Sequence, residues 1–151
     1  MSISGPTILV VEDNDDDLFA LKWSLGKGPF QLAVRHVPNG QQAVDYLSGV
    51  GSFSDRSAYP VPDLIFLDVK LPLVSGHEVL EWIGARPDLA GIPVVILSGS
   101  DEQKDHDRAV KGGARAYLVK PSTPKEIAEI LRRFLHPDES TLEPANRVAR
   151  T

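Results

Sequence analysis

Five short apolar runs, separated by stretches that carry helix signals, constrain the fold of this chain more than any other feature. They lie at residues 7–11, 31–37, 63–67, 94–97 and 116–119, and several are rich in Val and Ile, which favour strands. The run LIFL, just before Asp68, has four large apolar residues in a row, as a strand buried on both faces does. Strands that alternate with helices predict a parallel sheet joined by right-handed crossovers.

The fold class that follows is α/β, a doubly wound five-stranded parallel sheet with helices on both faces. We expect the flavodoxin-like strand order 2-1-3-4-5, which one sequence does not fix by itself. The 151 residues suffice for one domain, which we place at residues 1–136, with an extended Gly-, Ser- and Pro-rich loop at 48–62. Residues 137–151 lack apolar periodicity, and we expect a disordered tail there.

Helix start signals follow several of the apolar runs. Asn14 stands before three consecutive aspartates, which the positive end of a helix dipole favours in a first turn. Ser75 with Glu78, and Ser100 with Gln103, have the spacing of a capping box. These signals predict helices that begin just after the carboxyl ends of the first, third and fourth strands.

Composition excludes several classes of function. Sixteen basic and twenty-one acidic side chains give a net charge of −5, which argues against nonspecific nucleic-acid binding. The absence of cysteine excludes a disulfide scaffold and a thiolate metal site. No apolar run approaches membrane-spanning length, and the N-terminus lacks the basic segment of a signal peptide. We therefore expect a cytoplasmic protein that contacts neither nucleic acid nor membrane.

Polar side chains stand where four of the predicted strands end. Glu12 and Asp13 follow the first strand, Asp68 the third, Ser98 the fourth and Lys120 the fifth. The second strand ends in Val and Pro and contributes no chemistry. Because ligands of open parallel sheets bind beyond the carboxyl ends of the strands, we expect these side chains to converge at one edge.

Three neighbouring carboxylates repel one another unless a cation lies between them. A set of oxygen ligands without His or Cys suits a hard cation, and Mg²⁺ fits best because it binds through few carboxylates and keeps exchangeable waters. Lys120 adds a positive charge for an anion, and Ser98 adds a hydroxyl donor. The combination predicts a site for a phosphoryl group that is transferred to a carboxylate.

Four motifs, ILVVEDN, LIFLDVKLPLVSG, VVILSGS and AYLVKP, together resemble the receiver domain of bacterial two-component response regulators. The resemblance spans roughly residues 7–135. The long loop before the PDLIFLD run is similar to that of single-domain receivers paired with phytochrome-type sensor histidine kinases. The resemblance to these receivers implies that the chain is a stand-alone receiver, which accepts a phosphoryl group and is not an enzyme with turnover.

The resemblance also implies roles for individual residues. Asp68 would accept a phosphoryl group from the phosphohistidine of a histidine kinase. Mg²⁺ would be held by Glu12, Asp13, Asp68 and the backbone carbonyl of Lys70.

Three further roles concern the response to phosphorylation. Ser98 would bond the phosphoryl oxygens, Lys120 would pair with the phosphate, and Tyr117 would be an aromatic switch residue that turns inward when Ser98 moves. A helix at residues 101–111, with only two apolar residues, is the element we expect to rearrange together with Tyr117. The output would then be a protein contact, with an unknown downstream protein or with a second copy through the last α-β-α face.

Three alternatives compete with this interpretation. An aspartate-nucleophile phosphatase or phosphotransferase of the haloacid dehalogenase type would need a second Asp two residues after Asp68, where this chain has Lys70. A flavin-binding module would need a phosphate loop after the first strand, where the acidic EDNDDD stands. A degenerate receiver that only binds partners would not need the intact carboxylate, hydroxyl and lysine set.

Overall fold

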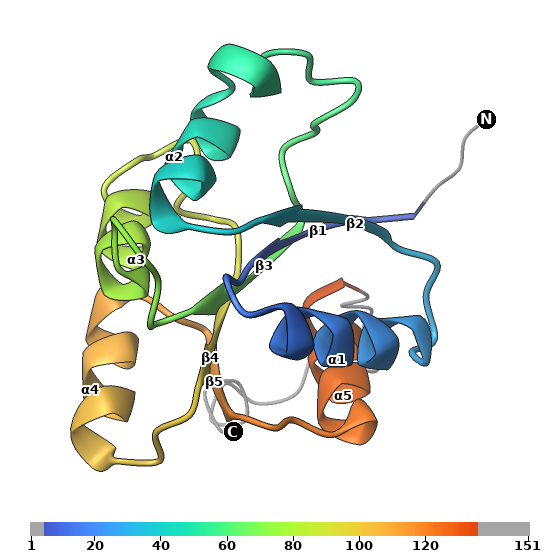
Figure 1. Cartoon of the computed structure of the whole chain (residues 1–151), viewed down its shortest axis with the longest axis vertical. Helices are drawn as coiled ribbons and strands as arrows, with labels where there is room; N and C mark the ends of the chain where they lie inside the picture. Colours follow the sequence, from blue (N-terminus) through green and yellow to red (C-terminus); the bar gives the residue numbers. More distant parts are fainter. Residues whose placement is uncertain (1–4, 136–151) are drawn as a thin grey trace.

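A five-stranded parallel sheet forms the centre of the computed structural model, which describes residues 5–135 (Figure 1). Across the sheet the strands run in the order β2-β1-β3-β4-β5, and each neighbouring pair is parallel. The strands in chain order are β1 (Thr7–Val11), β2 (Ala33–Val37), β3 (Leu64–Asp68), β4 (Val94–Ser98) and β5 (Ala116–Val119). The predicted doubly wound fold and its flavodoxin-like order are confirmed.

Within the described residues, helices cover both faces of the sheet. Figure 1 shows α1 and α5 on one face and α2, α3 and α4 on the other. The helices are α1 (Asp15–Gly26), α2 (Gly40–Ser48), α3 (Gly76–Gly84), α4 (Gln103–Gly112) and α5 (Pro124–Leu135), with a short 3-10 helix η1 (Gly51–Phe53) after α2. None of these helices is long and apolar enough to cross a membrane.

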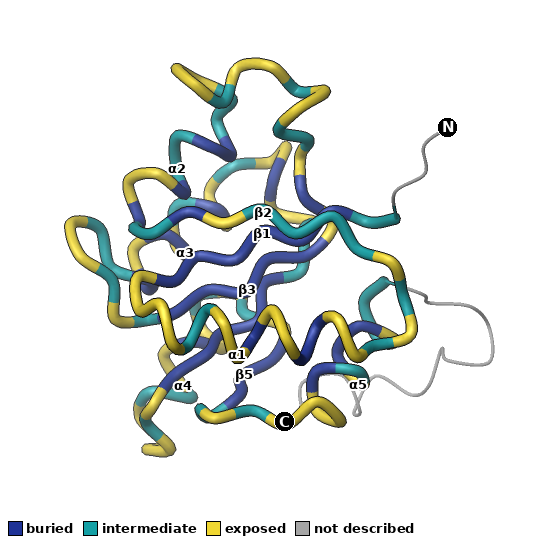
Figure 2. Tube along the Cα trace, turned by 45° about the vertical axis from the view of Figure 1, so that its right-hand side comes forward, coloured by how far each residue is buried: buried dark blue, intermediate teal, exposed yellow. Residues whose placement is uncertain are grey.

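The sheet divides the hydrophobic core into two layers. Because successive side chains of a strand point to opposite faces, Ile8 and Val10 of β1 pack in the layer of α1 and α5. Leu9 and Val11 pack in the layer of α2, α3 and α4. All residues of β1, β3 and β4 are buried, and Figure 2 shows β1 and β3 as dark strands between exposed helix surfaces. The unbroken apolar runs in the sequence therefore reflect burial on both faces.

Two of the predicted helix caps are present. The side chain of Asn14 accepts a hydrogen bond from the backbone N–H of Asp17 at 2.9 Å. At the start of α3, the Ser75 hydroxyl accepts from the Glu78 N–H, while the Glu78 carboxylate accepts from the Ser75 N–H. Both caps hold helices that follow directly after strands of the central sheet.

The predicted capping box at Ser100 is wrong. Helix α4 starts at Gln103, and its N-cap, Glu102, makes no side-chain capping bond. The Ser100 hydroxyl accepts from the Glu102 N–H and donates to the carboxylate of Asp105. The spacing in the sequence fits this local turn as well as it fits a capping box, and the turn delays the helix start.

The loop at 48–62 is tied to the end of α2. The Arg56 guanidinium donates to the backbone carbonyls of Tyr46, Leu47 and Tyr59, which satisfies acceptors that a helix end leaves open. The Tyr46 hydroxyl donates to the carbonyl of Pro60. These bonds hold the loop on the α2 side of the molecule, away from the carboxyl ends of β1 and β3. The predicted tail at 137–151 lies outside the described residues.

A glycine at the start of α3 allows this helix to approach the end of β3. A Cβ added at Gly76 would lie 2.2 Å from the backbone oxygen of Asp68, a distance that real contacts do not reach. At Gly84, near the other end of the same helix, a Cβ would meet the Gly112 oxygen at an ordinary 3.6 Å.

We expect Gly76→Ala to lower the free energy of unfolding by about 1–3 kcal/mol, because the backbone around Asp68 must move. Gly84→Ala is the matched control and should raise that free energy by up to about 1 kcal/mol. Urea unfolding of the three proteins measures both effects. Equal stabilities for the two variants would contradict the close packing inferred here.

Candidate phosphoryl-transfer site

Four strand ends contribute polar side chains to one edge of the sheet, as the topology requires. Glu12 and Asp13 follow β1, Asp68 is the last residue of β3, Ser98 the last of β4, and Lys120 follows β5. Lys120 bonds directly to Glu12 and Asp68, although more than fifty residues separate it from each in sequence. The structure thus brings acidic and basic groups from distant segments into one site.

The three carboxylates are close enough to hold one metal ion. One oxygen from each of Glu12, Asp13 and Asp68 can be chosen so that all three lie within 4.8 Å of one another. Glu12 and Asp68 are buried, whereas Asp13 is exposed. An exposed ligand leaves the site open to water and to an incoming phosphate. This all-oxygen set fits a hard divalent cation such as Mg²⁺.

Local backbone bonds orient the two buried carboxylates. Glu12 accepts from the N–H of Asn14 at 3.2 Å through one oxygen, and Asp68 accepts from the N–H of Lys70 at 3.1 Å through one oxygen. The second oxygen of each carboxylate accepts from the Lys120 ammonium. Both carboxylates are therefore held from two sides, by a backbone N–H and by the Lys120 ammonium.

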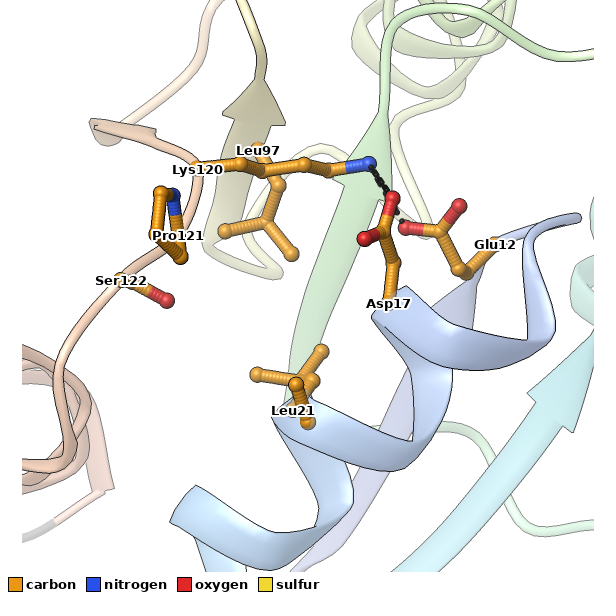
Figure 3. A pocket seen from close by; sticks show the side chains of 8 residues that line it. Glu12, Asp17, Leu21, Leu97, Lys120, Pro121 and Ser122 are labelled. Carbon is orange, nitrogen blue, oxygen red and sulfur yellow. Dashed lines mark hydrogen bonds and ion pairs between the residues drawn. The ribbon is translucent and has the colours of Figure 1, made fainter.

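Lys120 is the positive centre of the site. Its ammonium donates to Glu12 at 3.0 Å, to Asp17 at 2.9 Å and to Asp68 at 3.1 Å. Its backbone N–H donates to the carbonyl of Ser98 at 2.7 Å, so the end of β5 is anchored to the end of β4. Figure 3 shows the side chain extended across the pocket toward Asp17 and Glu12.

The sequence analysis missed Asp17. Its place in an acidic first turn is explained by the helix dipole alone. Helical periodicity could have revealed this residue. Asp17 precedes the buried Leu21 and Leu25 by one and two turns, so it lies on the face of α1 that packs inward. The Asp17 carboxylate is only partly exposed, and its partner is Lys120.

Ser98 and Tyr117 meet at the loop after β4. Ser98 is buried, and its hydroxyl accepts from the Ser100 N–H at 3.0 Å. The hydroxyl of Tyr117 donates to the carbonyl of Ser100 at 2.8 Å. The Tyr117 ring is buried and packs against the ring of His106 of α4, with centroids 4.1 Å apart. The inward position predicted for Tyr117 is thus already occupied in this structure.

The pKa values of Glu12 and Lys120 are shifted because several charged groups lie close together at the partly buried edge of the sheet. Burial raises the pKa of Glu12, and a hydrogen bond with Asp68 raises it further; the bond from Lys120 opposes both, and the resulting pKa is about 7. Burial alone would lower the pKa of Lys120, but the bonds to Asp17 and Glu12 and the charge of Asp68 outweigh it, so its pKa is raised. Lys120 therefore stays charged.

We expect Glu12→Gln to stabilise the metal-free protein at high pH. Because the folded state binds the Glu12 proton more tightly than the unfolded state, the native protein loses stability as pH rises from 4.5 to about 7. At about pH 8 with a chelator, the variant should gain about 1–3 kcal/mol, and at about pH 5 much less. Urea unfolding at both pH values measures this; an equal gain at both would contradict the raised pKa.

A five-stranded parallel sheet with an acidic cluster and a paired lysine at its carboxyl edge defines the class of receiver-like α/β domains. Sequence comparison agrees, since the family model described as response regulator receiver domain matches residues 8–132. The chain belongs to this family. The match favours the predicted receiver over the haloacid dehalogenase alternative, which receives no support.

Individual relatives include both curated proteins and solved structures. A probable methanogenesis regulatory protein, FilR2 of Methanothrix harundinacea, is 33% identical over 76% of this chain and 71% of its own length. The phosphorylated cyanobacterial phytochrome response regulator RcpA is 29% identical, with a TM-score of 0.79 over 89% of this chain and 97% of that chain. The Mn²⁺-bound response regulator Rcp1 is 29% identical, with a TM-score of 0.77 over 88% and 96%. The predicted likeness to phytochrome-associated receivers is confirmed.

Proposed function

We propose that this chain accepts a phosphoryl group on Asp68 from the phosphohistidine of a sensor histidine kinase, and that it signals through protein contacts. The observation that carries the proposal is the convergence of Asp68, two further carboxylates and Lys120 at one edge of the sheet. The donor kinase would be of phytochrome type, as the likeness to RcpA suggests. Because histidine kinases draw on ATP, we place the reaction in the cytoplasm.

In this reaction Asp68 is the nucleophile. One of its oxygens forms a bond to phosphorus while the bond from phosphorus to the donor's imidazole nitrogen breaks, and the imidazole keeps the electron pair. The Lys120 ammonium, 3.1 Å from Asp68, lies where it can pair with the transferred oxygens. The Ser98 hydroxyl accepts from the Ser100 N–H through its oxygen, and it would donate its own O–H to the transferred oxygens.

Mg²⁺ is the cation that we propose for the site. Glu12, Asp13, Asp68 and the backbone carbonyl of Lys70 would hold it, and it would offset the negative charge of the transferred phosphoryl group. Lys70 stands two residues after Asp68, where a phosphatase of the haloacid dehalogenase type has its second Asp, so we propose that the chain is a phosphoacceptor and not a phosphatase with turnover.

We expect acetyl phosphate with Mg²⁺ to add one phosphoryl group to Asp68. Intact mass spectrometry would show the gain, and hydroxylamine would remove it because an acyl phosphate reacts with this nucleophile. Asp68→Asn should abolish the gain, while Asp63→Asn, a control on an exposed aspartate before the same strand, should keep it. An unmodified native protein, or modification at another residue, would contradict the proposed function.

The signal would pass from the site to α4 through the loop that holds Ser98 and Ser100. Ala109 is the only buried residue of α4, and Val110 is 55% exposed, so little apolar area holds this helix to the sheet. Contacts to the ring and the hydroxyl of Tyr117 connect this region to β5. We propose that α4 and Tyr117 rearrange when Ser98 follows the phosphoryl group.

We expect beryllofluoride, a phosphoryl mimic, to change backbone amide exchange across residues 101–117. The α2 amides, on the far side of α3, are the internal control and should keep their exchange rates. Hydrogen exchange with mass spectrometry measures both regions in one experiment. Unchanged exchange across 101–117, with binding of the mimic established, would contradict the proposed switch.

The face of α4, β5 and α5 is the surface that we propose for a homodimer. It adjoins the switching region, so a change in α4 would alter any contact made there. Analytical ultracentrifugation with and without beryllofluoride tests this, and an unchanged monomer in both states would count against it. The downstream protein would use the same region.

A further inference from the structure

Asp17 differs from the other carboxylates bonded to Lys120. Glu12 and Asp68 are members of the acidic cluster that would hold the cation, whereas Asp17 is not. Its bond to the ammonium is nonetheless the shortest of the three, at 2.9 Å. Asp17 therefore contacts the site only through Lys120, as far as the described residues show.

The position of Asp17 is fixed by the start of α1. Its backbone N–H donates to the capping side chain of Asn14, which anchors the first turn directly behind Glu12. The Asp17 carboxylate then points across a small pocket to Lys120, as Figure 3 shows. Leu21, one turn further along α1, lines the same pocket as Lys120. The capped start of α1 thus fixes the position from which Asp17 bonds to Lys120.

Lysine needs such a contact because its long stem is flexible. Ordering this stem costs rotamer entropy, which a further bond to the ammonium helps to offset. An ammonium has three N–H donors, and Lys120 uses all three on carboxylates. Two of these acceptors, on Glu12 and Asp68, would hold the cation, and Asp68 would also accept the phosphoryl group. The Asp17 carboxylate takes part in neither and can keep its bond to Lys120 throughout.

We propose that Asp17 is a positioning residue, which holds the Lys120 ammonium over Asp68 while the other two carboxylates serve the reaction. This inference rests on the proposed function. Asp17 acts through Lys120 and does not touch the phosphoryl group. Its effect must therefore vanish when Lys120 is absent, whereas an effect on helix stability or on the overall charge of the site would remain.

Asp16, the residue before Asp17, provides the matched control for a substitution at Asp17. Asp16 lies in the same first turn, carries the same charge and is exposed. Asp16→Asn and Asp17→Asn therefore make the same change in charge and in the favourable interaction with the helix dipole. Only the second removes the carboxylate that accepts from Lys120.

We expect Asp17→Asn to slow the initial rate of phosphorylation by acetyl phosphate about three- to tenfold, because a misplaced lysine loses its fixed geometry. Asp16→Asn should leave the rate within about twofold of native. In the Lys120→Ala background, adding Asp17→Asn should make no further difference. Equal rates for the two single variants, or an equal slowing in both backgrounds, would overturn the inference.

A second readout does not depend on the reaction. In protein labelled with nitrogen-15 on lysine, the Lys120 ammonium should give a resolved NMR signal in the native chain and in Asp16→Asn, and should lose it in Asp17→Asn. A signal that persists in Asp17→Asn would also overturn the inference. If the native chain takes up no phosphate, the proposed function fails, and the NMR signal still decides whether Asp17 holds Lys120.

Discussion

The candidate site depends on the bonds from the Lys120 ammonium to the carboxylates of Glu12, Asp17 and Asp68. Glu12 and Asp68 are both buried, and burial together with the hydrogen bond to Asp68 raises the pKa of Glu12. The Lys120 ammonium donates to both carboxylates, at 3.0 Å to Glu12 and at 3.1 Å to Asp68, and offsets their negative charge. The pKa of Glu12 still reaches about 7, because burial and the neighbouring Asp68 outweigh the bond from Lys120.

The fold places Glu12, Asp68 and Lys120 together at one edge of the sheet. Parallel strands of order β2-β1-β3-β4-β5 put β1 and β3 in the centre, so the residues at their ends are buried yet open at one edge. The close approach of α3 at Gly76 and the capped start of α1 then fix the backbone on either side of the site. The burial of Glu12 beside Asp68 weakens the folded state as the pH rises, because it raises the pKa of Glu12.

The sequence supports the fold and much of the site for one physical reason. Unbroken apolar runs identify strands buried on both faces, and parallel topology puts all their carboxyl ends together, so Glu12, Asp68 and Lys120 could be expected to meet. Asp17 was not predicted, because its charge already had a sufficient explanation in the helix dipole. Ser100 was misassigned because one spacing fits two local bonding patterns, and the bond to Asp105 prevails. The buried ring of Tyr117 depends on its packing with His106, which no local pattern in the sequence encodes.

Paramagnetic relaxation by Mn²⁺ tests the central claim most directly, because the ion reports its own position without any phosphate. Amide signals of residues 12, 13, 68 and 70 should broaden first in a titration of the native protein, and an excess of Mg²⁺ should restore them. In Asp13→Asn the same broadening should need a much higher concentration of Mn²⁺. Broadening centred elsewhere on the described chain, or spread evenly over its acidic surface, would contradict the assembly of one cation site around Asp68.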